Sequence, residues 1–236
     1  MARFIWVIAV SFPLIVYYIL RAEYIVHHEH RYSEDYRYKV ARKMVRLMKR
    51  NAFIRTKVYG NDNLPKEGGY ILYPNHQGKY DAIGIIGGHE KPCTVVIDEE
   101  RSHIILADQF IKLINGARLD RKDYRSQVNI FRRVKEEVKK GRRYIIFAEG
   151  GYNKNRNNVR EFLPGAFKCA VEAKSPIVPV ALIDSYYPFE VNSLKPVTTQ
   201  VHFLSPIYYD DYKEMTTKEI ALVVRDRIAE AVEAYS

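Results

Sequence analysis

The chain has only two cysteines among its 236 residues, Cys93 and Cys169. They are too few for a disulfide framework and lack the close spacing of metal ligands, so we expect a folded body in a reducing compartment. His27 and His30 would share one face of a helix, but no carboxylate or thiol cluster completes a metal site, and none is predicted. Internal repeats, low-complexity tracts and a second-domain linker are also missing, which at this length favours one domain with a short appendage.

Acidic residues are the scarcer charged type: 28 Asp and Glu stand against 38 Lys and Arg, which gives a net charge of +10. Such a balance favours an anionic partner, namely nucleic acid, a membrane surface or an acidic carrier or substrate. The chain has no zinc-finger, helix-turn-helix or aromatic RNA-binding pattern, so nucleic acid is not expected as a partner. A hydrophobic fraction of 47% with 28% charged residues excludes a wholly disordered chain and a polytopic membrane protein.

No charged residue occurs from Phe4 to Leu20, and Arg3 and Arg21 flank this apolar run. As a helix the run reaches about 25 Å, slightly less than the roughly 30 Å hydrocarbon core of a bilayer, and Pro13 would kink it. A secretory signal peptide, a buried core helix and a short span or membrane-dipping anchor are all compatible with this pattern. We favour the anchor, because no small-residue cleavage site follows the run and only one basic residue precedes it.

Residues 36–50 have the spacing of an amphipathic helix, with Val40, Met44, Leu47 and Met48 on one face. The basic residues of this segment are Arg37, Lys39, Arg42, Lys43, Arg46, Lys49 and Arg50. Such a helix either packs on the body with a solvated charged face or lies on anionic lipid, and directly after an apolar anchor we favour the lipid surface. Residues 1–51 are therefore predicted to attach the chain to the cell membrane. The heavier positive charge after the apolar run predicts the body on the cytoplasmic face.

Short β-type runs alternate with helical ones after residue 51. The predicted strands are rich in Val, Ile, Tyr and Phe and cover residues 53–59, 70–73, 94–97, 144–147, 177–183 and 200–204. The predicted helices have helical apolar spacing and cover residues 104–115, 124–140, 165–174 and 218–235. This alternation predicts an α/β fold with a mixed, largely parallel central sheet flanked by helices, as one domain over residues 52–236.

An imidazole and a carboxylate, His76 and Asp81, follow the predicted strand 70–73. On a continuous helix two side chains five positions apart diverge by about 140°, so the pair meets only if His76 lies in a loop and Asp81 in the first helical turn. A carboxylate on the imidazole Nδ1 fixes the tautomer and leaves Nε2 free as a base, although this spacing alone also fits a purely structural pair. The sequence has no Gly-x-Ser-x-Gly elbow and no Ser or Cys beside the pair, so such a base would act directly on a substrate hydroxyl.

The predicted strand that ends at residue 147 is followed by a second polar segment at the carboxyl edge of the sheet, where ligands of α/β folds bind. Two adjacent glycines, Gly150 and Gly151, let the backbone approach a ligand closely, and their amides can cradle an anion. Lys154 and Arg156 are candidate phosphate ligands, and a plain strand-end turn with solvated charges is the alternative interpretation.

Four blocks of sequence resemble, in the right order, the motifs of the glycerolipid acyltransferases, the lysophosphatidic acid acyltransferase family. The blocks are Asn75-His76-x4-Asp81, Gly116-Ala117-Arg118-Leu119-Asp120-Arg121, Phe147-Ala148-Glu149-Gly150 and Pro176-Ile177-Val178-Pro179-Val180, the last preceded by Pro164-Gly165-Ala166-Phe167. Each block is modestly specific by itself. The ordered set, which spans residues 58–183, makes the resemblance strong.

The resemblance implies acyl transfer from acyl-CoA or acyl carrier protein to the free hydroxyl of a lysophospholipid, with 1-acyl-glycerol-3-phosphate as the expected acceptor and phosphatidic acid as the product. It implies His76 as general base and Asp81 as the carboxylate that orients it, without an acyl-enzyme, a metal or a bound cofactor. Backbone amides near His76 or Gly150 are candidate donors to the tetrahedral oxyanion. The acceptor-binding residues that it implies are Asn75, Arg121, Glu149, Gly150 and Gly151.

The third block departs from the family pattern Phe-Pro-Glu-Gly-Thr-Arg, because Ala148, Gly151 and Tyr152 replace its Pro, Thr and Arg. Loss of the Arg removes a fork-shaped phosphate ligand, and we hypothesise that Lys154 or Arg156 takes over phosphate binding. Two alternatives stay open. The acceptor is a different lyso-lipid without a phosphomonoester, or the chain is a non-catalytic basic protein that binds membranes.

Overall fold

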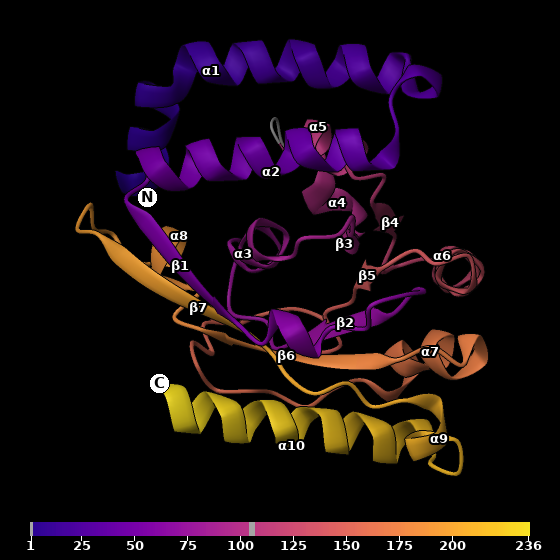
Figure 1. Ribbon diagram of the computed structural model, residues 1–236. Coiled ribbons are helices and arrows are strands. Elements are labelled where there is room, and N and C mark those ends of the chain that lie inside the picture. Colours follow the sequence, from indigo (N-terminus) through magenta and orange to yellow (C-terminus); the bar gives the residue numbers. More distant parts are fainter. Residues whose placement is uncertain (1, 104–106) are drawn as a thin grey trace.

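The computed structural model describes residues 2–103 and 107–236 of the chain. Within these residues, seven strands form one central sheet (Figure 1). Their bounds are β1 Ile54–Tyr59, β2 Ile71–Pro74, β3 Thr94–Asp98, β4 Ala117–Leu119, β5 Tyr144–Ile145, β6 Ile177–Ile183 and β7 Val197–Phe203. The spatial order of the strands is β1-β7-β6-β2-β5-β3-β4.

The prediction of a mixed, largely parallel sheet is confirmed. The strands β6, β2, β5, β3 and β4 all run parallel to one another. β7 pairs antiparallel with β6, and β1 pairs parallel with β7, so these two strands run against the other five. Because the five parallel strands end at the same edge, the loops that follow β2, β4, β5 and β6 meet there.

Both faces of the central strands are buried, which explains their unbroken apolar sequences. In β2, Ile71 and Tyr73 belong to one hydrophobic cluster, whereas Leu72 belongs to the cluster on the opposite face. β6 alternates in the same way, with Ala181 on one side and Leu182 on the other. The core therefore consists of two apolar layers with the sheet between them.

Helices cover both faces of the sheet. Their bounds are α1 Ala2–His27, α2 Glu34–Asn51, α3 Asp81–Gly88, α4 Glu99–Ser102, α5 Ala107–Leu113, α6 Tyr124–Lys139, α7 Lys168–Ala173, α8 Tyr187–Glu190, α9 Tyr209–Tyr212 and α10 Thr217–Tyr235, with 3₁₀ turns η1 Glu29–Arg31, η2 Asn61–Asn63 and η3 Pro164–Phe167. In Figure 1, α10 lies below the sheet, α3 lies on the other side, and α2 and then α1 lie above α3.

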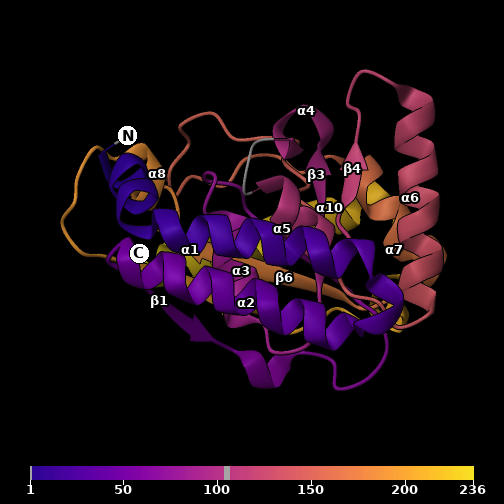
Figure 2. The same cartoon turned by 90° about the horizontal axis from the view of Figure 1, so that it is seen from above.

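α1 and α2 form an antiparallel hairpin over the α3 side of the sheet (Figure 2). Pro13 lies inside α1, and the first turns of this helix are bent relative to the rest (Figure 1), because a proline removes a backbone hydrogen bond and clashes with the preceding turn. Ser33 caps the start of α2 by accepting a hydrogen bond from the Tyr36 N–H at 3.2 Å. The predicted basic amphipathic helix is therefore present over residues 34–51.

α1 is held against the body along its length. At its start, the buried guanidinium of Arg3 donates hydrogen bonds to backbone carbonyls, among them Pro188 O at 3.1 Å. In its second half, Ala22 and Ile25 pack into a cluster with Val40 of α2 and Leu113 of α5. These contacts fix the orientation of α1 on the domain, so it does not project from the fold as a free tail.

The opposite face of α1 is apolar and exposed. Along this face Ile5, Ile8, Phe12, Val16 and Leu20 follow one another at helical spacing, with exposed fractions from 37 to 66%. Within the part of the chain that the structure describes, α1 is the one helix long and apolar enough to cross a membrane. The exposed stripe does not fit the alternative of a buried core helix, because a core helix would have these side chains covered.

Several predicted boundaries differ from the structure. The predicted strand 144–147 is only two residues long, because the chain leaves the sheet after Ile145 to enter the loop that carries Glu149. The predicted helix 165–174 is a 3₁₀ turn followed by the short α7, and the first three residues of the predicted helix 104–115 lie outside the described residues. Strand β4 and the short helices α4, α8 and α9 were not predicted.

Candidate active site

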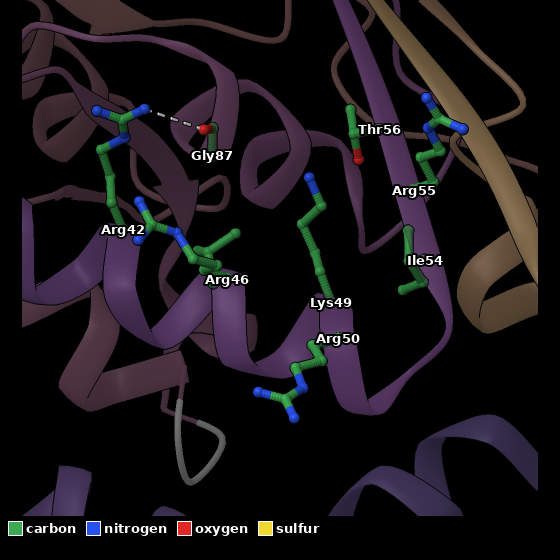
Figure 3. A pocket seen from close by; sticks show the side chains of 9 residues that line it. Arg42, Arg46, Lys49, Arg50, Ile54, Arg55, Thr56 and Gly87 are labelled. Atoms are coloured by element: carbon green, nitrogen blue, oxygen red, sulfur yellow. Dashed lines mark hydrogen bonds between the residues drawn. The ribbon is translucent and has the colours of Figure 1, made fainter.

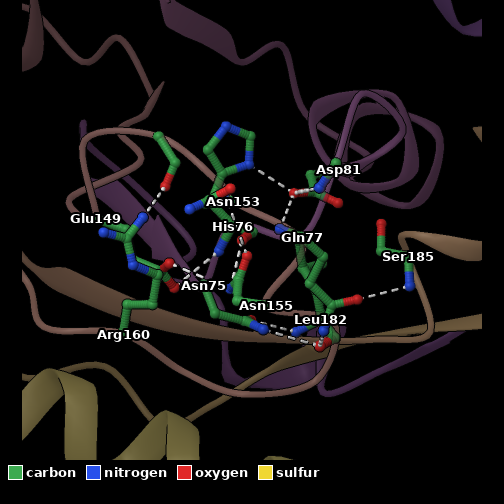
Figure 4. Close-up of polar contacts among 12 residues, drawn as sticks. Asn75, His76, Gln77, Asp81, Glu149, Asn153, Asn155, Arg160, Leu182 and Ser185 are labelled. Atoms are coloured by element: carbon green, nitrogen blue, oxygen red, sulfur yellow. Dashed lines mark hydrogen bonds and ion pairs between the residues drawn. The ribbon is translucent and has the colours of Figure 1, made fainter. Parts of the chain in front are cut away.

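The loop after β2 brings His76 and Asp81 together. Asp81 is the first residue of α3, and its Oδ2 lies 2.7 Å from Nδ1 of His76 (Figure 4). The strand–loop–helix connection required by the five-residue spacing is therefore present. The Asp81 carboxyl group is fully buried, whereas the His76 side chain keeps 17% of its surface exposed. The imidazole thus has one edge on the carboxylate and one edge open to a ligand.

The surroundings of Asp81 define the tautomer of His76. The same Oδ2 accepts hydrogen bonds from the backbone N–H groups of Gln77 at 2.6 Å and Gly78 at 2.9 Å. A carboxylate oxygen held by two N–H donors is an acceptor, so the proton of the imidazole lies on Nδ1, between the ring and the carboxylate. Nε2 then carries the lone pair and is the atom that can remove a proton from a substrate.

Two aromatic rings hold the imidazole plane. Phe147 stacks on His76 with ring centroids 4.1 Å apart, and Tyr152 meets it edge-on at 4.7 Å. Both rings come from the segment after β5, the strand next to β2 in the sheet. The sequence analysis noted Tyr152 only because it replaces an Arg of the family pattern. In the structure, its ring contacts the imidazole of His76 directly.

Asn75 was expected to bind the substrate, but its side chain is buried and bonded to the neighbouring strand. It is fully buried, its Nδ2 donates to Leu182 O at 3.0 Å and its Oδ1 accepts from Leu182 N at 2.7 Å. Both polar ends of the side chain are therefore used between β2 and β6. Gln77, which the sequence analysis missed, is also buried and donates to Leu182 O at 2.7 Å. These two amides position the loop that carries His76.

Glu149 supports the same loop from β5. Its Oε1 accepts a hydrogen bond from the backbone N–H of His76 at 3.0 Å, and Asn155 donates to the His76 carbonyl at 2.9 Å (Figure 4). Burial raises the pKa of Glu149 to about 7, and hydrogen bonds from the backbone of His76 and of Arg160 oppose this rise. Glu149 is thus part of the site, as expected, and it contacts the catalytic loop directly.

The expected oxyanion donors around His76 are already occupied. The amide of His76 donates to Glu149, those of Gln77 and Gly78 donate to Asp81, and that of Gly150 donates to Phe147 O at 3.2 Å. A backbone N–H that is committed to such a bond has no second proton to offer an oxyanion. The amides of His76 and Gly150 themselves are thus engaged in this structure, and donation to the oxyanion by another backbone amide near them stays a prediction.

Arg121 meets the glycine pair of the third block. A Cβ added to Gly151 would lie 3.6 Å from Nη1 of Arg121, and one added to Gly150 would lie 3.9 Å from its Nη2. Both glycines have positive φ, 69° and 144°, and a side chain on Gly150 would also clash with Leu163 at 2.8 Å. The half-exposed guanidinium and the glycine backbone thus share one face of the site, as predicted from blocks far apart in the sequence.

Lys154 and Arg156 lie on another side of the loop. They line a cavity of about 470 Å³ together with Tyr152, Asn153, Tyr186, Glu190 and Val191. Burial and the nearby Asp81 carboxylate raise the pKa of Glu190, and Lys154 lowers it. Tyr152 therefore contacts His76 and also lines this cavity. No sequence signal pointed to Glu190, because its place beside Gly78 depends on the tertiary fold.

Neither cysteine is a nucleophile for this site. Cys93 and Cys169 are free and buried, and burial raises the pKa of each thiol to about 12, so both stay protonated at neutral pH. Among the described residues, no group of three or more His, Cys, Asp and Glu side chains is arranged to hold a metal ion.

The fold and the site define a class of protein. An imidazole held by a buried carboxylate, at the carboxyl edge of a mostly parallel sheet and without a nucleophile beside it, is suited to activating a substrate hydroxyl directly. Residues 55–183 match the family described as Acyltransferase, which is more than half of the chain. The chain belongs to this acyltransferase family.

Individual relatives agree with this assignment. The chain is 30% identical over 175 residues to the 1-acyl-sn-glycerol-3-phosphate acyltransferase of Saccharomyces cerevisiae, a match that covers 68% of this chain and 57% of the yeast protein. It is 29% identical over 137 residues to the probable 1-acyl-sn-glycerol-3-phosphate acyltransferase of Mycoplasma genitalium, covering 56% of this chain and 50% of the relative. The chain thus spans about half the length of these two relatives.

A solved structure has the same fold over nearly the whole chain. It is the 1-acyl-sn-glycerophosphate (LPA) acyltransferase PlsC from Thermotoga maritima, with a TM-score of 0.78 and 23% sequence identity. The match covers 96% of this chain and 91% of that one. The likeness therefore extends to the N-terminal helices and not only to the sheet.

Proposed function

We propose that this chain is a membrane-associated acyltransferase that moves a fatty acyl group from acyl-CoA or acyl carrier protein to the free hydroxyl of 1-acyl-sn-glycerol-3-phosphate. The observation that carries the proposal is the His76–Asp81 pair, with Nδ1 on the carboxylate at 2.7 Å and the other ring edge open. The names of the relatives support the acceptor class. We propose no metal and no bound cofactor, because the substrate hydroxyl and the thioester are sufficient for the reaction.

In the proposed reaction, Nε2 of His76 removes the proton of the acceptor hydroxyl as the oxygen attacks the thioester carbon. Asp81 stabilises the imidazolium that forms and keeps its proton on Nδ1. The tetrahedral intermediate then collapses, the C–S bond breaks, and the leaving thiolate takes the proton from Nε2. An ester and a free thiol are the products, and the imidazole returns to its starting tautomer.

Exchange of the imidazole tests this mechanism. His76→Ala should lower turnover by about 10²–10⁴-fold, the usual contribution of a positioned acid–base group. The substitution should leave the circular dichroism spectrum unchanged, since His76 lies in a loop at the edge of the sheet. Purified His76→Ala protein that turns over near the wild-type rate would rule out the mechanism.

The phosphate of the acceptor needs cationic ligands. Arg121 beside the two glycines is the ligand that the second block implies, and its guanidinium is half exposed. We further propose that Lys154 or Arg156 replaces the Arg that the family has at the position of Tyr152, because both line a cavity together with Tyr152, whose ring contacts His76. The alternative, an acceptor without a phosphomonoester, is favoured by Tyr152 itself, since its ring cannot pair with a phosphate as an Arg does.

Equilibrium binding of a non-reacting acceptor analogue tests the phosphate ligands. Lys154→Ala and Arg156→Ala should weaken binding roughly tenfold if either side chain donates to a charged phosphate. Lys168→Ala is the control, because Lys168 is exposed on α7 and does not line the cavity. Affinity that is unchanged in both cavity variants would contradict this role and favour a different lyso-lipid acceptor.

Membrane attachment is proposed through the exposed apolar face of α1. Because the other face of α1 is packed on α2 and α5, we propose that the helix lies in the interface of the bilayer rather than across it. The basic residues of α2 follow directly, and they favour an anionic leaflet such as the cytoplasmic face of the cell membrane. This arrangement would hold the site near its lipid acceptor.

A further inference from the structure

A second cavity lies at the opposite end of α3 from Asp81, between the end of that helix, α2 and β1 (Figure 3). Its volume is about 330 Å³, within the usual range of roughly 300–1,000 Å³ for small-ligand sites. Its lining residues are Arg42, Val45, Arg46, Lys49, Arg50, Ile54, Arg55, Thr56 and Gly87. The site described above uses none of them.

The charge of this cavity has one sign. Arg42, Arg46 and Lys49 rise from α2 toward the end of α3, whereas Arg55 extends from the other side of β1 (Figure 3). The lining contains no Asp or Glu, and within residues 2–103 and 107–236 no carboxylate pairs with any of these three inward-pointing cations. Three cations gathered without a counter-ion repel one another, so the cavity is suited to an anion.

The hydrogen bonds and the burial of these cations favour an anion as the ligand of the cavity. One arm of Arg42 donates to Gly87 O at 3.3 Å, but its Nε is buried and has no partner within the described part of the chain. Burial lowers the pKa of Lys49, which indicates an ammonium group that is partly removed from water. A ligand with negatively charged oxygens would give the Nε of Arg42 a hydrogen-bond partner and would stabilise the charge of Lys49.

The cavity borders the surface that we propose to face the membrane. Phe53, the residue before β1, is exposed and stacks on Trp6 of α1 with ring centroids 6.3 Å apart. The indole N–H of Trp6 donates to Asn51 O at 3.1 Å. Exposed aromatic rings with one polar end gather at the headgroup level of a bilayer, and here the pair lies between the apolar stripe of α1 and Ile54 of the cavity.

From these observations we infer that the cavity binds the headgroup phosphate of an anionic phospholipid from the surrounding bilayer, at a site separate from that of the acceptor. Guanidinium forks and an ammonium group are the usual ligands of such a phosphate. The acyl chains of the lipid would lie along the Trp6–Phe53 pair and the stripe of α1. The inference extends the proposed membrane attachment and does not depend on the acyl-transfer reaction.

A soluble lipid separates this site from general attraction to a charged surface. Dihexanoyl phosphatidylglycerol, below its micellar concentration, is titrated into the full chain and into Arg46→Gln/Lys49→Gln. The control is Lys39→Gln/Lys43→Gln, which removes the same charge from exposed positions of α2 that do not line the cavity. We expect affinity roughly tenfold weaker in the cavity variant and unchanged in the control. Dihexanoyl phosphatidylcholine should bind weakly to all three proteins.

Other outcomes overturn the inference. An equal loss in both double variants indicates diffuse charge and not a built site. Inorganic phosphate that binds as tightly as the lipid, with the same loss in the cavity variant, indicates a free anion as ligand. If apo acyl carrier protein loses affinity in the cavity variant and the lipid does not, the partner is an acidic protein.

If Arg46→Gln/Lys49→Gln is unstable, single substitutions can test the lipid site instead. Arg46 is exposed, so Arg46→Gln leaves the core intact, and it should still weaken lipid binding, whereas Lys49→Arg should keep it. Unchanged lipid affinity in Arg46→Gln, with a wild-type melting temperature, would contradict the site.

Discussion

At the residue scale, one carboxylate oxygen organises the loop that carries His76. Oδ2 of Asp81 receives His76 Nδ1 and the amides of Gln77 and Gly78, all within 2.9 Å. The same atom therefore orients the base and fixes the backbone that carries it. Charge-assisted bonds of this kind are roughly twice as strong as neutral ones, so a single substitution should disturb both functions.

Asp81→Asn is expected to lower turnover by about 10²–10⁴-fold with little change in acceptor KM. The amide oxygen can take the place of Oδ2 and accept the same three bonds, but it carries no charge, so it stabilises the imidazolium less when Nε2 takes up the substrate proton. Steady-state kinetics with the purified variant provide the measurement. A variant that keeps more than half of the wild-type turnover would show that the reaction does not depend on the charge of this carboxylate.

Tyr152 is the residue where this chain departs most clearly from its family. Tyr152→Arg should raise the preference for a phosphomonoester acceptor over a phosphodiester acceptor roughly tenfold, since a guanidinium beside His76 adds a charged hydrogen bond to the phosphate. The measurement is the ratio of kcat/KM for the two acceptors. Tyr152→Phe keeps the ring and should keep the ratio. The same change of ratio in both variants would exclude a specific effect of the guanidinium.

At the element scale, α3 shows how tertiary contacts override local preference. Its eight residues include Gly84, Gly87 and Gly88, and such a sequence has low helix propensity. A Cβ at Gly87 would lie 3.0 Å from Val45, and one at Gly88 would lie 2.8 Å from Val58. The glycines allow α2 and β1 to approach α3, and the buried Ile85 and Ile86 pack into the hydrophobic cluster on this face of the sheet. Because of these glycines, the sequence pattern did not predict α3 as a helix beyond the first turn that carries Asp81.

His89 at the end of α3 gives a pH dependence with a defined sign. Its Nδ1–H donates to Lys91 O at 2.6 Å, its Nε2 accepts from the Tyr70 hydroxyl at 2.7 Å, and burial lowers its pKa to about 4. Protonation is disfavoured in the folded state, so the stability is fully present above the unfolded pKa of about 6.5 and is lost as the pH falls toward 4. Acid should therefore weaken the fold at this helix end.

The difference between the free energies of unfolding of wild type and His89→Gln measures this effect. Lowering the pH from 7.5 to 5 should reduce the advantage of the wild type by roughly 2 kcal/mol. Taking the difference cancels the other titrating groups, including Glu149, whose raised pKa acts with the opposite sign. A difference that stays constant with pH would mean that His89 titrates normally in the folded protein.

At the scale of the whole molecule, substitutions on the exposed stripe of α1 should change membrane binding without changing the stability of the fold. Phe12 and Leu20 are 60% and 66% exposed, so Phe12→Glu/Leu20→Glu should leave the melting temperature nearly unchanged. The added charges oppose insertion into the bilayer interface, and co-sedimentation with anionic vesicles should be largely lost. Leu222→Glu, an exposed apolar position on α10 at the opposite side of the molecule, is the control (Figure 1).

The membrane prediction would fail in two ways. Vesicle binding by the α1 variant equal to that of the wild type would mean that the stripe does not contact lipid. Equal loss in Leu222→Glu would mean that added negative charge alone repels the vesicles.

The sequence by itself determined the α/β class, the basic amphipathic segment and the pairing of His76 with Asp81. The class and the segment follow from periodicity, whereas the spacing left the pair conditional on a strand–loop–helix turn and the resemblance of the ordered blocks supported it. The resemblance of the blocks also implied that Arg121 and the glycine pair belong to one site, and the structure places the guanidinium beside both glycines.

Only the tertiary structure decided which groups near His76 are occupied, how Asn75 is used, and that α1 packs along the body. The bond from His76 N–H to Glu149 joins residues 73 apart in the chain, and those between Asn75 and Leu182 join residues 107 apart. The basic cavity likewise needs α2, β1 and α3 together. No periodicity encodes such contacts, because the packing of distant segments sets the partner of each polar group.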